Sequence, residues 1–396
     1  MAKQSSTQRD TSNGTPLERL EVRGLSKVFR RAGGEEVDAV SNVDLTVRSR
    51  EIIALLGPSG CGKSTLLRCV AGLDEPNSGS VHINGKVAFD SATGFVAPPN
   101  KRDVSMMFQS YALWPHMSLE DNVAYPLVTR GVGKAAARRR ANEYLELVGL
   151  HRLGGQYPGT ISGGQQQRAA LARTLISDPS VVLFDEPLSN VDAKVRVQLR
   201  RELLRLHAEL GFAAIYVTHD QDEAMGIGDK IAVMRDGHVE QLDTPVVVYE
   251  RPRSLYTAEF VGAANIILGA TFRGVDGTKA IFDTPIGAVV GDADGVWPGG
   301  EQAPPTNSAV TLMARPEYCQ LLPGSDRTGP NHWSATLTRT IYAGSRTEFY
   351  CAAGDHHFSA WKVGAPDDLD HADEATFHIP SSALRVVELH RPDGPE

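Results

Sequence analysis

The sequence has little of several features that would place it in a protein class at once. It contains 4 cysteines among 396 residues, and no two of them form a Cys-x-x-Cys pair. Neither a structural zinc site nor a disulfide framework is therefore indicated. No apolar run is long enough to cross a bilayer as a helix. Residues 1–15 are polar and lack the apolar core of a signal peptide, so we expect residues 1–18 to form a disordered tail.

The chain also lacks a strong charge of either sign. Its formal net charge is -8 at pH 7, and 41% of its residues are hydrophobic. A protein that holds nucleic acid by bulk charge is usually basic, so we expect no nucleic-acid partner. We expect a cytosolic chain that reaches the cytoplasmic face of a membrane as a peripheral subunit, through a partner. The length allows two or three domains, each with its own core.

The most informative stretch is a glycine-rich loop between a predicted strand, 52–56, and a predicted helix, 63–71. The loop consists of Gly57, Pro58, Ser59, Gly60, Cys61, Gly62, Lys63, Ser64 and Thr65. It fits the phosphate-loop pattern of Gly, four residues, Gly-Lys-Ser/Thr. The helix start offers unpaired N–H groups and partial positive charge. Lys63 can reach nucleotide phosphates and Ser64 can ligate Mg²⁺, which predicts ATP and Mg²⁺ as cofactors. The strand and helix on either side disfavour the alternative, a glycine turn with a chance lysine.

Two carboxylates follow another apolar run, 182–184. A strand end beside a phosphate loop is where a Mg²⁺-binding aspartate lies, so we expect Asp185 to hold the ion, through water. Glu186 can orient or deprotonate the attacking water. Acidic residues also end strands as solvated caps, and the pair alone is a weak signal.

Polar residues follow two further predicted strands. Gln109 comes after the strand 104–108 and can ligate Mg²⁺ or orient water. His219 comes after the strand 215–218 and can touch the γ-phosphate. A lone glutamine is more often plain surface and a lone histidine more often structural, so each gains weight only from its place at the same sheet edge.

A second glycine turn, Ser162-Gly163-Gly164-Gln165, opens a predicted helix over 166–176. It is either another anion-binding helix start or an ordinary N-cap. Two phosphate sites in one fold need not serve one nucleotide. The turn therefore predicts a homodimer in which each chain offers it to the ATP of the other.

The order of elements predicts two folded domains. Strands alternate with helices up to about residue 260, which indicates an α/β core with a mostly parallel sheet over residues 19–260. Beyond that point short alternating runs are separated by loops rich in Gly, Pro and Asp. Residues 261–396 are thus predicted to form a small all-β domain, an OB-like barrel, with the boundary between 240 and 262.

These motifs, in this order, resemble the ATP-binding subunits of ABC transporters over about residues 20–260. The series is GPSGCGKST, Gln109, SGGQQQR, LFDEP, LSNVD and THD. The resemblance implies an ATPase fold and a head-to-tail dimer with nucleotide sandwiched between the chains. It implies that Asp192 lies in a loop crossing that interface and that Phe29 stacks on adenine, although Phe29 also fits a core position. Ile161 departs conservatively from the leucine usual in the family.

The C-terminal part narrows the resemblance. The phrases YERP (249–252), FVG (260–262), Asn265 and RPE (315–317) resemble importer ATPases with an appended β regulatory domain. Such subunits energise uptake of maltose-type sugars, polyamines, ferric iron or phosphonates. The loop 90–100 and the phrase FVGAAN favour the iron, polyamine and phosphonate group over the sugar group. The resemblance implies transmembrane permease subunits as partners and, through the complex, an external solute-binding protein.

Two other classes of function fit less well. A soluble ABC ATPase acting on DNA or ribosomes usually has two cassettes or a long coiled coil, and neither is seen in the sequence. A small-molecule kinase with a phosphate loop leaves Ser162 to Gln165 unexplained. The solute stays open, because the permease and the binding protein select it. The ATPase motifs all precede residue 261, so the β domain is predicted to be regulatory or structural.

The segment Ser110 to Asn122 is unusually apolar and aromatic for a loop. It includes Tyr111, Leu113, Trp114, Pro115, His116 and Met117. An exposed apolar patch usually marks a partner surface, so we expect this segment to dock on the permease. The alternative is that these side chains fill the core beneath the helical subdomain.

Overall fold

The computed structural model describes residues 11–12, 15–30, 33–189, 191–297, 302–324, 329–365 and 374–390. The chain divides into two compact units, Met1–Pro245 and Val246–Glu396, and each is considered by itself. Most of the predicted tail, 1–18, lies outside the described residues. Within it, β1 (Thr11–Ser12) pairs antiparallel with β2 (Thr15–Pro16), and β3 begins at Glu18.

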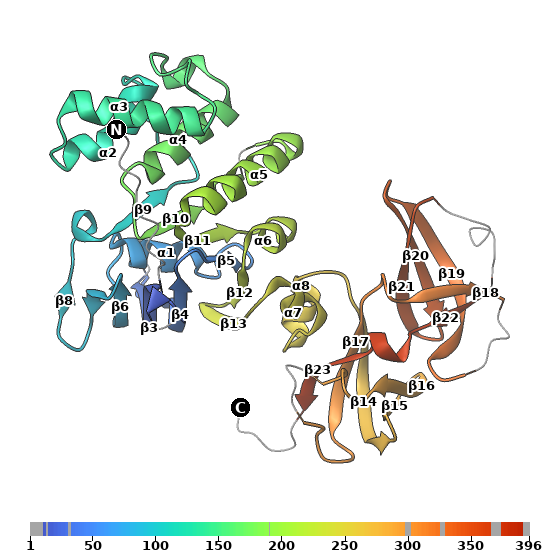
Figure 1. Cartoon of the computed structure of the whole chain (residues 1–396). Coiled ribbons are helices and arrows are strands. Elements are labelled where there is room, and N and C mark those ends of the chain that lie inside the picture. The colour runs from blue at the N-terminus through green and yellow to red at the C-terminus, as the bar shows by residue number, and fades with distance from the viewer. Residues whose placement is uncertain are drawn as a thin grey trace. The chain divides into compact units, whose positions relative to one another are not determined.

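The first unit alternates strands and helices, as the sequence predicts (Figure 1). In chain order its further elements are β3 (Glu18–Arg30), β4 (Glu36–Arg48), β5 (Ile52–Leu56), α1 (Lys63–Ala71), β6 (Ser78–Ile83), β7 (Lys86–Asp90), β8 (Phe95–Val96), η1 (Pro99–Lys101), β9 (Val104–Met107), α2 (Leu119–Thr129), α3 (Lys134–Leu147), η2 (Pro158–Thr160), α4 (Gly163–Leu175), β10 (Val181–Asp185), α5 (Ala193–Leu210), β11 (Ala213–Thr218), α6 (Gln221–Ile227), β12 (Lys230–Arg235) and β13 (His238–Asp243).

The central sheet of this unit has six strands in the order β13-β12-β5-β11-β10-β9. All neighbouring pairs are parallel except β12 and β13. The middle strands β5 and β11 are buried at every residue. They are continuous apolar runs because both faces of a parallel sheet are covered. The predicted α/β core with a mostly parallel sheet is confirmed.

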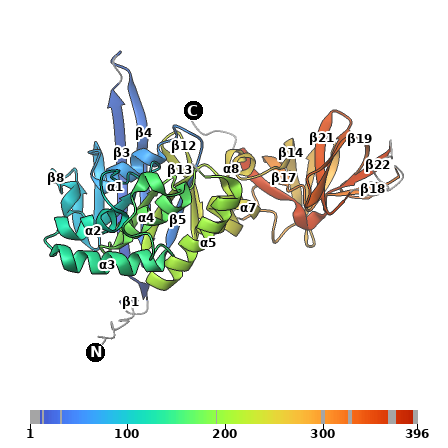
Figure 2. The ribbon, with the colours of Figure 1, turned by 90° about the horizontal axis from the view of Figure 1, so that it is seen from above.

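Successive residues of these strands serve two different cores. Phe184 and Tyr216 pack with side chains of α2 to α5 on one face. Leu183 and Ile215 pack on the other face with α1 and a second sheet, ordered β4-β3-β6-β7-β8 and antiparallel. The sequence indicates several of these outer strands but not that they form a sheet of their own. Figure 2 shows the β3–β4 hairpin projecting from the rest of this unit.

The second unit contains two short helices followed by strands. Its elements are α7 (Pro245–Glu250), α8 (Leu255–Phe260), β14 (Asn265–Asp276), β15 (Lys279–Thr284), β16 (Gly287–Asp292), β17 (Ala309–Ala314), β18 (Gln320–Pro323), β19 (His332–Tyr342), β20 (Arg346–Ala353), β21 (His356–Val363), β22 (Ala375–His378), η5 (Ser381–Ala383) and β23 (Arg385–His390). The strands form two antiparallel sheets, β16-β15-β14-β17-β23 and β18-β22-β19-β20-β21, around one core that includes Phe282, Phe349 and Phe377. The predicted all-β character is confirmed, and the described strands form these two sheets where the sequence predicts an OB-like barrel.

The division after Pro245 lies within the range 240–262 in which we expect the boundary, and before the domain limit of 260/261. The reason is Arg315, which is 1% exposed at the end of β17. Its guanidinium donates to the carbonyls of Tyr249, Ala258 and Gly262 at 2.9 to 3.0 Å and lies 4.2 Å from the Tyr249 ring. A buried guanidinium needs such partners, and here they tie α7 and α8 to the β domain.

We expect Arg315→Met to destabilise the second unit by about 3 kcal/mol or more, because the buried carbonyls that Arg315 bonds would lose their donor. Urea unfolding of the full chain, followed by tryptophan fluorescence, measures the change. Arg273→Ala is the matched control, since Arg273 makes an exposed pair with Asp283 at 2.7 Å and such pairs contribute at most about 1 kcal/mol. Equal stability of the two variants would show that Arg315 is not the tie.

Candidate functional site

The register of the central sheet brings the predicted polar groups to one edge. Leu56, which precedes the phosphate loop, pairs with Thr218, and Asp185 pairs with Val217. Phe184 pairs with Met107, the last residue of β9. The carboxyl ends of parallel strands share an edge, and ligands of open α/β sheets bind there. The phosphate loop and the ends of β9, β10 and β11 therefore form one candidate site.

Two glycines of the loop allow no side chain. A Cβ on Gly57 would lie 2.6 Å from the carbonyl oxygen of Met234. Gly62 has φ 102°, and a Cβ there would lie 2.0 Å from the carbonyl oxygen of Ala39. Helix α1 begins directly after Gly62, with no side chain capping its first turn. Its N–H groups thus stay available for an anion, which is the arrangement that binds phosphate.

Lys63 is the cation of this loop, and it is only 5% exposed. Its Nζ donates to the carbonyl oxygens of Gly57 at 2.7 Å and Pro58 at 2.8 Å, and lies 3.7 Å from Cys61 Sγ. Within the described part of the chain no carboxylate pairs with it. A buried ammonium held only by dipoles is costly unless an anion compensates it, so the loop suits a phosphate.

Ser64 and Asp185 meet at this edge. The Ser64 hydroxyl donates to Asp185 Oδ1 at 2.7 Å. No cluster of three or more His, Cys, Asp or Glu side chains able to hold a metal occurs among the described residues. A hydroxyl and one carboxylate fit Mg²⁺, which takes few protein ligands and completes its octahedron with phosphate oxygens and water.

Glu186 and His219 are also brought together. His219 Nδ1 lies 3.2 Å from Glu186 Oε2, and the two side chains are 56% and 21% exposed. Glu186 has φ 46°, a left-handed conformation that is uncommon for a residue with a side chain. Its N–H donates to the Val217 carbonyl at 3.2 Å, which anchors the turn to β11. Backbone strain of this kind is concentrated at functional sites.

Gln109 is linked to the Glu186 turn through the hydroxyl group of Ser189. Its Nε2 donates to Ser189 Oγ at 3.2 Å, and the Ser189 hydroxyl donates to the Glu186 carbonyl at 3.0 Å. Gln109 itself is exposed. The sequence predicts Gln109 at this site but gives no sign of Ser189, because a serine in a turn is too common to attract notice.

The turn at Ser162 has the geometry of an N-cap, and its interpretation as an anion-binding helix start stays a prediction. Ser162 caps α4 in a capping box with Gln165, which satisfies two N–H groups. Asp192 caps α5 with one carboxylate oxygen, which accepts from two N–H groups of the first turn. The two caps line one open hollow of about 350 Å³ together with Gly163. No hydrogen bond or ion pair between described residues joins this turn to the phosphate loop 57–65 of the same chain.

Phe29 lies near the end of β3 and is 40% exposed, with Lys27 Nζ 4.9 Å from its ring centroid. Exposure excludes the core interpretation of this residue. An open aromatic face on the projecting hairpin is available for stacking.

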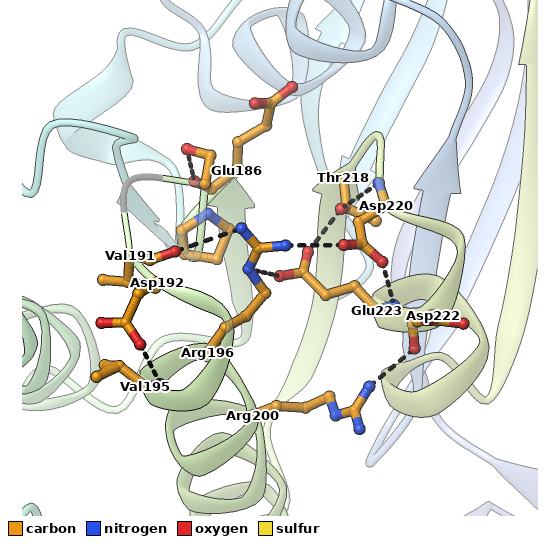
Figure 3. Close-up of polar contacts among 12 residues, drawn as sticks. Glu186, Val191, Asp192, Val195, Arg196, Arg200, Thr218, Asp220, Asp222 and Glu223 are labelled. Carbon is orange, nitrogen blue, oxygen red and sulfur yellow. Dashed lines mark hydrogen bonds and ion pairs between the residues drawn. The ribbon is translucent and has the colours of Figure 1, made fainter. Parts of the chain in front are cut away.

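A charged network behind the His219 turn is not predicted from the sequence (Figure 3). Arg196 on α5 contacts Asp220 and Glu223, and Thr218 contacts both carboxylate residues. Glu223 is 4% exposed, and burial raises the pKa of its carboxyl group. The pattern Asp-x-x-Glu at 220–223 is typical of a helix start, and it is the one signal that points to this cluster.

The ABC transporter family matches residues 40–189. The Fe(3+) ions import ATP-binding protein FbpC 1 of Rhizobium meliloti is 43% identical over 311 residues, 78% of this chain and 82% of that protein. The spermidine/putrescine import ATP-binding protein PotA of Thermobifida fusca is 39% identical over 339 residues, 86% and 84% of the two chains. A dimeric bacterial ABC transporter cassette, MJ0796, covers 57% of this chain and 98% of its own, with 31% identity and a TM-score of 0.50.

The chain belongs to the family of ATP-binding subunits of ABC import systems, and it is an ATPase. The resemblance stated from the motifs is thus confirmed, over the soluble-cassette and kinase alternatives. None of the helices in the described ranges combines the length and hydropathy that crossing a membrane requires.

We expect Lys63→Ala to weaken ATP binding about 10- to 100-fold, because a charged hydrogen-bond donor to phosphate contributes about 1.5–3 kcal/mol. Titration with a fluorescent ATP analogue measures the affinity. Lys86→Ala is the control, since Lys86 is exposed at the start of β7. Unchanged affinity in the Lys63 variant would contradict the phosphate-loop interpretation.

Proposed function

We propose that two copies of this chain bind and hydrolyse Mg²⁺-ATP on the cytoplasmic face of a membrane and so drive solute uptake through a permease. The observation that carries the proposal is the sheet edge where the Ser64–Asp185 pair lies beside the Glu186–His219 pair. A buried cation, a metal-type oxygen pair and a carboxylate–imidazole pair are the groups that phosphate-bond hydrolysis requires.

In this proposal each group of the site has a separate role. The first turn of α1 and Lys63 hold the phosphates, and Phe29 stacks on adenine. Ser64 and Asp185 hold Mg²⁺, which when bound neutralises charge on the phosphate oxygens. Glu186 orients or deprotonates the attacking water, and His219 faces the γ-phosphate. Gln109 ligates Mg²⁺ or orients the attacking water, and its amide contacts Ser189 of the Glu186 turn.

We propose that Ser162 to Gln165 and Asp192 face the partner chain in a head-to-tail dimer. Support comes from the hollow that these caps share and from the lack of any bond between described residues of this turn and of the loop 57–65. The dimeric state of the similar MJ0796 cassette agrees with this arrangement. Permease subunits and an external solute-binding protein complete the complex.

We propose that the segment Ser110 to Asn122 docks on the permease. Its half-buried aromatic part and its exposed tip have different roles. Trp114 is half-buried, 4.4 Å from the Tyr125 ring and 4.7 Å from the Arg173 guanidinium. Pro115 and His116, which follow it, are exposed. The aromatic part therefore serves the core, and the exposed tip is the part offered to a partner.

We propose a solute of the ferric iron or polyamine class, with phosphonate as a third member of that group. Similarity to the iron and polyamine subunits extends over 78% and 86% of this chain, into the β domain. The trehalose/maltose subunit MalK of Thermococcus litoralis is 49% identical over 58% of this chain, and the iron subunit FbpC of Agrobacterium fabrum is 50% identical over the same share. Uptake by the whole complex over a panel of these solutes decides between the classes, and a sugar response would favour the maltose-type alternative. The β domain is proposed to be regulatory.

We expect Glu186→Gln to lower the ATP hydrolysis rate at least about 100-fold while ATP still binds, because an amide cannot accept the proton of the attacking water. Phosphate release gives the rate, and gel filtration with ATP shows the trapped dimer. Glu209→Gln, an exposed carboxylate on α5, is the control. Near-normal turnover in the Glu186 variant would remove it from the catalytic role.

We expect single cysteines at Pro115 and His116 to cross-link to the permease in the assembled complex. The four native cysteines are buried, so the introduced thiols are the reactive ones. A cysteine at Lys86, exposed on β7, is the control that should not cross-link. If neither position in the segment reaches the permease while ATP-driven uptake is intact, the docking surface lies elsewhere.

A further inference from the structure

The charged network around Arg196 joins the segment before α5 to the turn before α6 (Figure 3). Arg196 lies in the first turn of α5, four residues after its cap Asp192. One guanidinium nitrogen donates to Asp220 Oδ2 at 2.9 Å, and another donates to the Val191 carbonyl at 3.3 Å. A single side chain therefore holds the loop before α5 and the turn before α6.

The turn before α6 contains three hydrogen bonds of its own. The Asp220 N–H donates to Thr218 Oγ1 at 3.0 Å, and the Thr218 hydroxyl donates to Glu223 Oε2 at 2.6 Å. The Glu223 N–H donates in turn to Asp220 Oδ1 at 3.0 Å. These bonds fix Thr218 and Asp220, the residues that precede and follow His219.

His219 depends on those neighbours for its position. Its side chain is 56% exposed and meets Glu186 at 3.2 Å, beyond the end of β11 where sheet pairing stops. A catalytic group displaced by about 1 Å can lose as much as 100-fold in rate. What holds Thr218 and Asp220 therefore decides where the imidazole lies.

We infer that Arg196 is a positioning residue, which ties the Asp192 loop to the His219 turn and so holds His219 against Glu186. The inference rests on the proposed roles of Glu186 and His219 and adds a link between them and the loop expected at the partner chain. A movement of that loop is passed to Asp220 through the guanidinium. The buried Arg196 Nε lies 3.9 Å from Glu223 Oε1, too far for a hydrogen bond.

The chain offers a matched control one turn further along the same helix. Arg200 donates to the main-chain carbonyl of Asp222 at 2.9 Å and lies on the same side of α5. It shares the residue type, the helix and the neighbouring element with Arg196. Arg200 therefore contacts α6 itself and not the turn that contains His219.

The test compares steady-state ATPase kinetics of the full-length chain with those of R196A and R200A. We expect R196A to lower kcat about 10-fold or more with the KM for ATP within about twofold of the parent. R200A should keep both constants within about twofold. A kcat for R196A equal to that of R200A would overturn the inference, as would a loss confined to KM.

A second variant, D220N, changes the other member of the Arg196–Asp220 pair. It keeps the inference testable if R196A misfolds. D220N keeps the acceptor that caps α6 but removes the charge that Arg196 pairs with. We expect the same fall in kcat, and the double variant R196A/D220N should be no slower than R196A. Multiplicative losses would show that the two residues act separately. Thermal unfolding of each variant, and binding of an ATP analogue, show that the fold and the nucleotide site are intact.

A failure of the proposed function is distinguishable from a failure of this inference. E186Q tests whether Glu186 is catalytic, whatever the outcome at Arg196. If E186Q is inactive and R196A is as fast as R200A, the catalytic assignment stands and the positioning role falls.

Discussion

The parallel pairing of β5 with β11, and of β11 with β10, is the constraint on which the site depends. It sets Leu56 beside Thr218 and Val217 beside Asp185, so three separate stretches of sequence end at one edge. A slip by one residue would exchange the side chains of the two cores, moving Phe184 and Tyr216 into the space that Leu183 and Ile215 fill, so the packing of both cores holds the register. The groups proposed to be catalytic lie on turns just beyond the pairing, where the backbone can take strained conformations such as that of Glu186.

Much of this organisation could be read from the sequence, because local pattern carries it. Helix α1 occupies the predicted residues 63–71, and the strand–loop–helix context defines the phosphate loop without any tertiary information. The β domain follows from alternating short runs. Local pattern cannot tell which sheet a strand joins, so the separate antiparallel sheet containing β3 and β6 was not predicted.

The residues that the sequence leaves out are those defined by contacts between distant segments. Arg196 looks like any arginine on the polar face of a helix until α5 and α6 are packed side by side. Arg315 is visible as part of a motif, but its burial against the carbonyls of α7 and α8 appears only in the fold. In each case the side chain satisfies backbone or carboxylate groups that lie more than twenty residues away in the chain, which no local pattern records.

The central claim is that one nucleotide site is built from the phosphate loop of one chain and the Ser162 turn of another. Cross-linking between a chain with Ser59→Cys and a second, differently tagged chain with Ser162→Cys tests it most directly. The account predicts a cross-link between the two chains that forms with Mg²⁺-ATP in a hydrolysis-blocked background and is absent without nucleotide. A cross-link that forms equally well without ATP, or none at all under conditions where ATP is bound, would contradict it.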